Sequence, residues 1–184
     1  MKYLVYEVAS GQPLFTQRTA PSLPAEFSFI EVDDDIVTAT GDTVVNGALA
    51  PYAPSLTDKQ AAKVQAANAN YNALMSVGFT LNGTPFQIDA VSQSQIAAMG
   101  ALALGSIADP ANSPWSAGFY WVAADNSHVP MDAATTYAFA RAVALYVSSC
   151  ILHLRAIKDA IAGAADQAAL DAIDVTAGYP PPSG

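Results

Sequence analysis

The residues that could do chemistry in this chain are few and scattered. Cys150 and His153 lie three positions apart in one helical segment, a spacing that could serve a cysteine–histidine pair or a shared metal ion. Cys150, however, falls in an apolar repeat, where a thiol stays protonated and inert. His128 stands in the turn-like segment DNSHVP, where a solvated role is usual and a pH switch or ligand is the alternative. We therefore expect no metal site and no cofactor from these groups.

Acidic side chains offer two further possibilities. A calcium loop could start at Asp33, Asp34 and Asp35, but the stretch lacks the glycine and the last glutamate of an EF-hand, which favours a charged turn. A glycan hydrolase could use Asp125 and Asp132, because such enzymes place two carboxylates beside aromatic rings. The ordinary roles of these two residues are a turn and a helix cap. Phosphate-loop, Gly-x-Ser-x-Gly and His-Glu-x-x-His motifs are absent from the sequence, so we expect a protein that is not an enzyme.

Composition narrows the class of partner. The 184 residues are 52% hydrophobic and 12% charged, which is not the composition of a disordered chain. A net charge of −9 without a basic cluster argues against binding to nucleic acid or to an anionic membrane. The first residues do not supply the apolar region of a signal peptide, and no segment was expected to reach the roughly 18 apolar residues of a membrane span. With a single cysteine, these features indicate a chain made in the cytoplasm and without an internal disulfide.

Residues 1–54 have the pattern of a small β module. Alternating or apolar runs predict strands at 2–8, 13–18, 26–32, 36–40 and 43–52. Asn46-Gly47 predicts a type I′ hairpin turn, because both residues tolerate a positive φ. Such a module is too small to bury much apolar surface, so we expect it to dock on something else.

Residues 55–184 predict a helical domain that also contains two hairpins. Capping boxes at Thr57-x-x-Gln60 and Ser92-x-x-Gln95 predict the starts of two helices, and Asp132 caps a third over 133–163. The hairpins are expected at 78–89, around Asn82-Gly83, and at 119–131, and a short helical piece is expected near 166–174. Asn82-Gly83-Thr84 also matches a glycosylation site, but the absence of a secretory signal favours a turn. Pairing the two hairpins in one small antiparallel sheet backed by the helices makes the fold class α+β.

The long helix contains an apolar seam with heptad spacing. Its candidate self-association residues are Val143, Val147, Cys150, Leu154, Ile157 and Ile161. Ala140 extends the seam at its start, and other apolar residues widen it beyond what a two-stranded coiled coil buries. Two interpretations remain open and are compatible: a central helix of a monomeric domain, or a seam around a symmetry axis of a homo-oligomer.

Aromatic residues are concentrated in one segment and at the C-terminal end. The candidate partner-contact residues are Trp115, Tyr120, Trp121 and Tyr179. Packing in the core of a small sheet is one role for them, and an exposed anchor for a partner protein is the other.

Four stretches between about Lys59 and Tyr179 resemble a bacteriophage domain family of unknown function that is encoded beside tail-fibre genes. They are GFTLNGTPFQID with SQSQI, then FYWVAADNSHVPMDAATTYAF, then HLRAIKDAI, and last ALDAIDVTAGYPP. The N-terminal β module is similar to the variable leading regions of such proteins, though less specifically. Tyr179 stands where the pattern has tryptophan.

The resemblance implies a product of a tailed phage or prophage, made in the bacterial cytoplasm and located in the tail of the virion. Its expected partners are other tail proteins of the fibre or baseplate. The resemblance also favours a homo-oligomer, and a trimer in particular, because phage fibres are commonly trimeric. It carries over no catalytic residue. An alternative is a tail-fibre assembly chaperone that is absent from the mature virion, and a tail-borne glycan hydrolase is the minor alternative.

Overall fold

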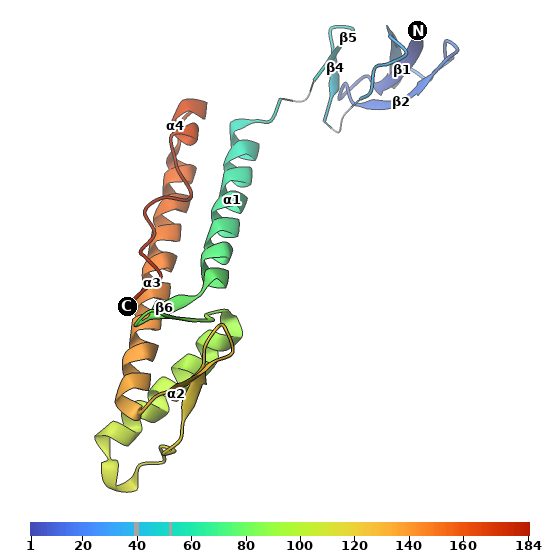
Figure 1. Cartoon of the computed structure of the whole chain (residues 1–184). Helices are drawn as coiled ribbons and strands as arrows, with labels where there is room; N and C mark the ends of the chain where they lie inside the picture. The colour runs from blue at the N-terminus through green and yellow to red at the C-terminus, as the bar shows by residue number, and fades with distance from the viewer. Residues whose placement is uncertain (39–40, 52) are drawn as a thin grey trace. The chain divides into compact units, whose positions relative to one another are not determined.

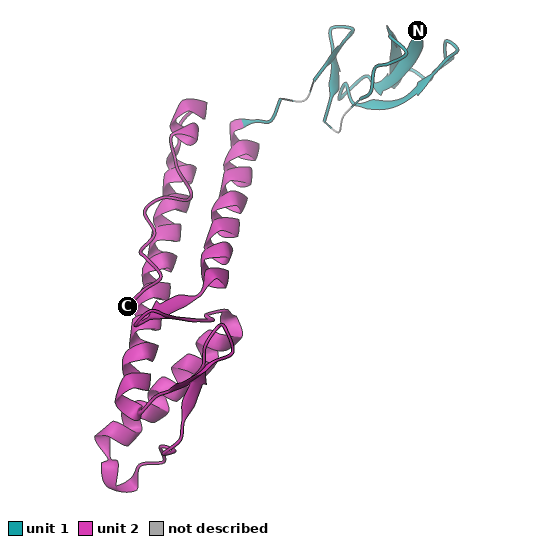
Figure 2. Ribbon diagram, in the orientation of Figure 1, with its two compact units in different colours: residues 1–55 teal, residues 56–184 magenta. Residues whose placement is uncertain are grey.

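The computed structural model describes residues 1–38, 41–51 and 53–184, and these form two compact units (Figures 1 and 2). Unit 1 is Met1–Ser55 and unit 2 is Leu56–Gly184, so the units meet one residue after the boundary that the sequence predicts. The fold class is α+β, as expected: strands form unit 1, and unit 2 combines helices with small hairpins.

Unit 1 is built on a three-stranded antiparallel sheet in the order β2-β1-β3. The bounds are β1 Lys2–Glu7, β2 Pro13–Gln17, β3 Phe27–Val32, and, in a separate hairpin, β4 Thr43–Val45 and β5 Ala48–Ala50. The turn of that hairpin has the predicted positive φ values, 52° at Asn46 and 76° at Gly47. Val44 N donates to Gly11 O at 2.6 Å and so ties the hairpin to the first turn of the unit.

The strand predicted at 36–40 is wrong for residues 36–38, which are irregular, while residues 39–40 lie outside the described residues. The turn that starts at Asp33 has already ended strand pairing, since Ile36 N donates back to Asp33 O at 3.2 Å. The apolar run was therefore too short a signal for a strand. The core of unit 1 is small: its buried apolar side chains among the described residues are Leu4, Val5 and Val44.

Unit 2 is organised by one long helix, α3, which packs against both other long helices of the unit (Figure 1). In chain order its elements are α1 Leu56–Val77, β6 Phe79–Leu81, β7 Thr84–Phe86, α2 Ala90–Ala108, a 3₁₀ turn Pro110–Asn112, β8 Tyr120–Val122, β9 His128–Pro130, α3 Ala133–Gly163 and α4 Gln167–Asp171. The two hairpins and the long helix were predicted nearly to the residue. Gly78, at φ 96°, ends α1 as expected, and a Cβ there would collide with Phe86 O.

One of the three predicted helix starts is confirmed. Asp132 caps α3, and its carboxylate accepts a hydrogen bond from Thr135 N at 2.7 Å. The capping box predicted at Ser92 is wrong, because α2 begins earlier, at Ala90. Its cap is Asp89, which accepts from Val91 N at 2.9 Å and from Ser92 N at 3.0 Å.

The capping box predicted at Thr57 is also wrong, because α1 already begins at Leu56. The Gln60 side chain does not reach back to its own helix start. Its amide donates instead to Ile161 O at 3.0 Å and to Ala164 O at 3.1 Å. Gln60 thus donates to carbonyl groups at the C-terminal end of α3 and joins α1 to α3.

The two hairpins of unit 2 do not form one sheet, contrary to the prediction. They are separate two-stranded sheets, and one main-chain bond links them, from Ala124 N to Pro85 O at 2.9 Å. Pro85 explains the separation: it lies opposite Thr80 on the outer edge of β7 and has no N–H with which to continue a ladder. The partner of the β6 edge is instead the C-terminal tail, since Ser183 pairs with Thr80 as a parallel bridge.

Unit 2 has two apolar core clusters along α3. The first gathers both hairpins, α2, the C-terminal end of α1 and the part of α3 up to Cys150 around Phe79, Phe86 and Phe139. The second joins α1, the second half of α3 and α4 around Ile161 and Leu170. Both clusters lie on the side of α3 that faces the other helices, so the domain has a continuous core of its own.

By length and composition, α3 is the one helix among the described residues that could cross a membrane. The expectation that no segment approaches such a span was therefore too strong. The inward side of α3 packs on α1 and α2, and core helices of globular domains pass the same test.

Candidate functional site

The predicted seam of α3 faces the core of unit 2. Val143, Cys150, Ile157 and Ile161 are buried, and Val147 and Leu154 are half-buried against the same clusters. This is the central-helix interpretation. These six side chains are already in contact within the chain and are not a free surface for a second copy. Self-association remains a prediction. The exposed large apolar residues of α3 are Tyr137, Leu145, Ile151 and Leu152.

Three of the four predicted contact aromatics are half-buried, and the fourth is exposed. Trp121 and Tyr179 belong to the core: the Trp121 ring lies 5.8 Å from that of Phe139, and the Tyr179 ring lies 4.5 Å from that of His153. Trp115 is half-buried before the second hairpin and packs edge-on against Phe119, at 4.9 Å between ring centroids. Tyr120 is 45% exposed and is the accessible ring of the four.

The register of β8 and β9 explains this division. Trp121 pairs with Val129, and both side chains point toward α3, where they join the core cluster. The neighbouring positions must then point outward. There the Tyr120 and His128 rings stack, with centroids 4.0 Å apart and planes inclined by 18°. His128 is thus part of an exposed aromatic pair, and it belongs to no group of three or more candidate metal ligands within the described residues.

Two grooves border the second hairpin. The first has a volume of about 580 Å³ and runs beside Trp115, the Tyr120–His128 pair and Asp132. The second, about 430 Å³, lies between β8 and the start of α2. Its lining includes Trp121, Met99 and three carboxamide side chains, Gln87, Gln95 and Asn126. We call this second one the amide groove. Sequence patterns did not predict it, because its residues come from three separate elements.

Cys150 and His153 do not form a pair. Cys150 is fully buried in the first core cluster, and burial raises the pKa of its thiol. His153 Nε2 donates to Ala177 O at 2.8 Å, and its ring packs edge-on against Tyr179. The histidine therefore fastens the C-terminal segment to α3, and the thiol is neutral and inaccessible.

Asp125 and Asp132 have the ordinary roles of a turn and a cap. Asp125 accepts from Ser127 N at 2.9 Å, and Asp132 caps α3. Hydrogen bonds from the side chain and main chain of Ser127 lower the pKa of Asp125, and those of Thr135 lower the pKa of Asp132. A glycosidase acid needs a raised pKa. The two residues also lie in different local structures on either side of β9: Asp125 is in the turn before it, and Asp132 is the cap of α3 after it.

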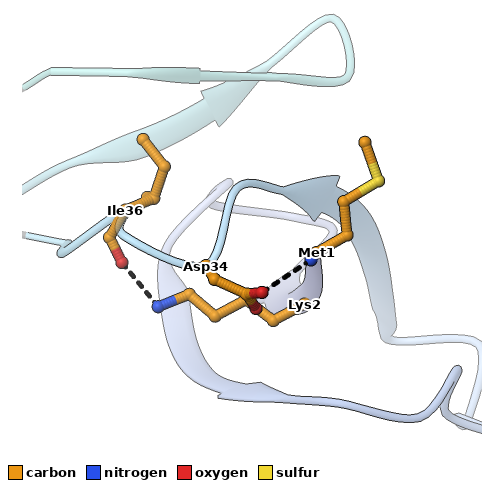
Figure 3. A network of polar contacts seen from close by, with 4 residues as sticks. All are labelled: Met1, Lys2, Asp34 and Ile36. Carbon is orange, nitrogen blue, oxygen red and sulfur yellow. Dashed lines mark hydrogen bonds and ion pairs between the residues drawn. The ribbon is translucent and has the colours of Figure 1, made fainter.

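The acidic stretch of unit 1 makes local contacts (Figure 3). The Met1 ammonium group donates to Asp34 Oδ2 at 2.9 Å, and Lys2 Nζ donates to Ile36 O at 2.6 Å. The Met1 hydrogen bond and charge lower the pKa of Asp34. Both members of the ion pair are well exposed, so it adds little to stability. The expected charged turn is present at Asp34–Asp35.

An aromatic row crosses the sheet of unit 1. Val5 is the register partner of both Phe15 on β2 and Phe29 on β3, so the three side chains lie on one face. Val5 is buried, but Phe15 remains 51% exposed and Phe29 38% exposed. Tyr3 packs edge-on against Phe29, at 5.3 Å between ring centroids. We call Phe15, Val5 and Phe29 the aromatic row. The Phe-Ser-Phe alternation at the start of β3 could have indicated the position of Phe29, whereas β2 has no such alternation.

Residues 58–177 match a family described as Domain of unknown function (DUF4376), and the chain belongs to that family. No curated protein and no solved structure matches the chain. The matched region covers α1 to the segment after α4, so it comprises nearly all of unit 2 and none of unit 1.

Proposed function

We propose that this chain is a structural protein of a bacteriophage tail, a component of the fibre or baseplate that acts through contacts with other tail proteins. In this proposal unit 1 docks on one tail protein, and unit 2 is a stable domain that presents its outer surface to another. The phage assignment is supported by the four stretches within residues 59–179 that resemble tail-associated proteins.

The aromatic row of unit 1 carries the proposal of a docking role. Unit 1 spans 55 residues, and its described residues include three buried apolar side chains, so it has little core of its own, yet it leaves two phenylalanine rings at its surface. Covering Phe15 and Phe29 with a partner would remove apolar area from water, and aromatic anchors of this kind often dominate protein interfaces. The exposed row is therefore better explained by a protein partner than by the needs of the isolated unit.

The titratable groups of unit 2 support a role without catalysis. The thiol is buried, the aspartates used as caps have lowered pKa values, and the described residues hold no cluster of three or more metal-ligating side chains. A net charge of −9 favours partners other than nucleic acid. The glycan-hydrolase alternative has no supporting geometry at Asp125 and Asp132.

Quantitative mass spectrometry of purified phage particles tests the proposal. We expect this chain in particles washed with high salt, at a fixed ratio to the major tail proteins. Absence from washed particles, with abundance in infected cells, would reject the virion role and favour the assembly chaperone. Co-expression then decides that alternative: a chaperone is required for soluble, trimeric fibre protein, and a virion component is not.

A further inference from the structure

The outer edge of β8 has unused main-chain groups. Met131 N donates to Phe119 O at 3.1 Å, and Ala123 N donates to Ser127 O at 2.9 Å, so the odd-numbered residues of this strand face β9. In an antiparallel pair the residues between them direct their N–H and C=O groups outward. Tyr120 and Val122 are these residues, and their outward groups have no hydrogen-bond partner in the described part of the chain.

The first hairpin shows how such an edge is filled. Thr80 on β6 also lies opposite a proline, Pro85, just as Tyr120 lies opposite Pro130. The outward groups of Thr80 bind the C-terminal tail: Thr80 N donates to Pro182 O at 2.8 Å, and Gly184 N donates to Thr80 O at 3.1 Å. An extended segment therefore completes one hairpin of this fold. On the equivalent edge of the other hairpin, Ala124 N donates to Pro85 O at 2.9 Å, and the edge is open at Tyr120 and Val122.

The amide groove runs along this open edge. Gln87, Gln95 and Asn126 line it, and none of their side chains has a hydrogen bond within the described residues. A carboxamide both donates and accepts, which matches the groups of a peptide main chain. No charged side chain is among the lining residues, so the groove suits an uncharged occupant better than an ionic one.

The groove also has an apolar side. Side chains alternate between the two faces of a sheet. In a strand added beside β8, the residue that pairs with Trp121 would therefore place its side chain on the same face as Trp121. Trp121 and the half-buried Met99 of α2 line the groove there. An apolar side chain at the centre of the added strand would fit this position.

We propose that the open edge of β8 binds an extended, uncharged segment of a partner protein as an additional strand, with a central apolar side chain between Trp121 and Met99. This inference rests on the proposed function for the identity of the partner, a tail protein, and it names the binding mode. The occupant of β8 would use the same main-chain contacts that the tail makes with Thr80.

Binding of short peptides to the full chain tests the inference. The probe is a library of uncharged, end-capped seven-residue peptides in which threonine alternates with valine, leucine, isoleucine or phenylalanine. We expect members with dissociation constants below about 1 mM. In NMR spectra of the ¹⁵N-labelled chain they should shift the Tyr120 and Val122 amides and slow their hydrogen exchange. A library without such a binder overturns the inference.

Val122→Pro is the decisive variant, and Val122→Ala is its matched control. Proline removes the outward N–H, and its ring blocks the edge, but the ladder to β9 survives because that N–H is not part of it. We expect Val122→Pro to weaken binding about tenfold or more and Val122→Ala to stay within about threefold. Gln95→Ala, an exposed change on α2, should weaken it about threefold and keeps the test valid if the proline variant misfolds.

Two other outcomes would overturn the inference. One is equal peptide affinity of Val122→Pro and Val122→Ala in folded proteins. The other is a groove that binds maltohexaose, a neutral oligosaccharide, and no peptide. The proposed function stands or falls separately: a chain present in washed particles without peptide binding refutes only this inference, and an absent chain with peptide binding refutes only the virion role.

Discussion

Phe139→Ala should be among the most damaging single truncations in unit 2. Phe139 is fully buried at the point where α3 meets both hairpins. Its ring centroid lies 4.8 Å from that of Phe86, 5.8 Å from that of Trp121 and 6.4 Å from that of Phe79. The substitution therefore opens a cavity between three aromatic neighbours, and no exposed side chain is placed to fill it.

The expected loss follows from the size of that cavity. Truncating a buried phenylalanine to alanine costs about 3–5 kcal/mol in total. A ring pair is worth about 0.5–1.5 kcal/mol beyond the buried area, so the loss of three such pairs places Phe139 toward the top of that range. We expect a value near the upper end, about 4–5 kcal/mol. A domain of this size is stable by about 5–15 kcal/mol, so the variant keeps a fold that is close to marginal.

Urea denaturation followed by circular dichroism at the helix band measures the loss, because the long helices all belong to unit 2. With a slope of about 2 kcal/mol per molar urea, the midpoint should fall by about 2 M. Tyr137→Ala is the control. Tyr137 lies two positions before Phe139 on the same helix but is 37% exposed, so the substitution should change stability by less than about 1 kcal/mol. A loss below about 1 kcal/mol for Phe139→Ala, at an unchanged slope, would refute the packing described for unit 2.

Two substitutions and one labelling experiment test single features of unit 2. Gln60→Ala removes two hydrogen bonds to the end of α3, so we expect a loss of about 1–2 kcal/mol in unfolding free energy and faster hydrogen exchange near Ile161. The lowered pKa of Asp132 means that its contribution to stability is present above the unfolded value of about 3.9 and is lost as the pH falls through the folded value; the melting temperature of Asp132→Asn should thus fall less on acidification. Cys150 should resist iodoacetamide at about pH 8 in the native chain and react after unfolding in guanidinium chloride.

For each of these three experiments, one result would contradict the structure. Gln65→Ala, a substitution at an exposed position of α1, should leave the unfolding free energy and the hydrogen exchange near Ile161 unaltered. An equal effect of Gln60→Ala and Gln65→Ala would contradict the contact between α1 and α3. Identical acid sensitivity of wild type and Asp132→Asn would show that the cap does not titrate as described, since asparagine caps helices at any pH. Rapid labelling of the native thiol would contradict its burial.

Local signals made the long helix and the hairpins predictable. Asp132 marks the start of α3 at the first residue of a sustained apolar period, and Asn-Gly turns fix the φ values of two hairpins whatever surrounds them. The apolar seam was recognised for the same reason. Its partner could not be inferred, because a stripe of this width packs equally well against helices of the same chain or of another copy.

The predictions that failed depended on tertiary contacts. Thr57-x-x-Gln60 has the pattern of a capping box, but the Gln60 amide is used by carbonyl groups about a hundred residues later in the chain. Joining the hairpins in one sheet ignored Pro85, which was visible in the sequence and removes a donor from the outer edge of β7. The amide groove needed the register of β8 and the position of α2, and neither follows from spacing alone.

The amount of this chain in washed phage particles, compared between wild type and a Phe15→Ser/Phe29→Ser variant, tests the docking role most directly. Leu14→Ser/Val45→Ser, which removes exposed apolar side chains of unit 1 outside the aromatic row, is the matched control and should leave the amount in particles unchanged. The account predicts normal amounts of the wild type, and loss of the unit 1 variant from particles while it remains folded and soluble in infected cells. Particles that retain the unit 1 variant at the wild-type ratio would contradict the claim that the aromatic row attaches this protein to the tail.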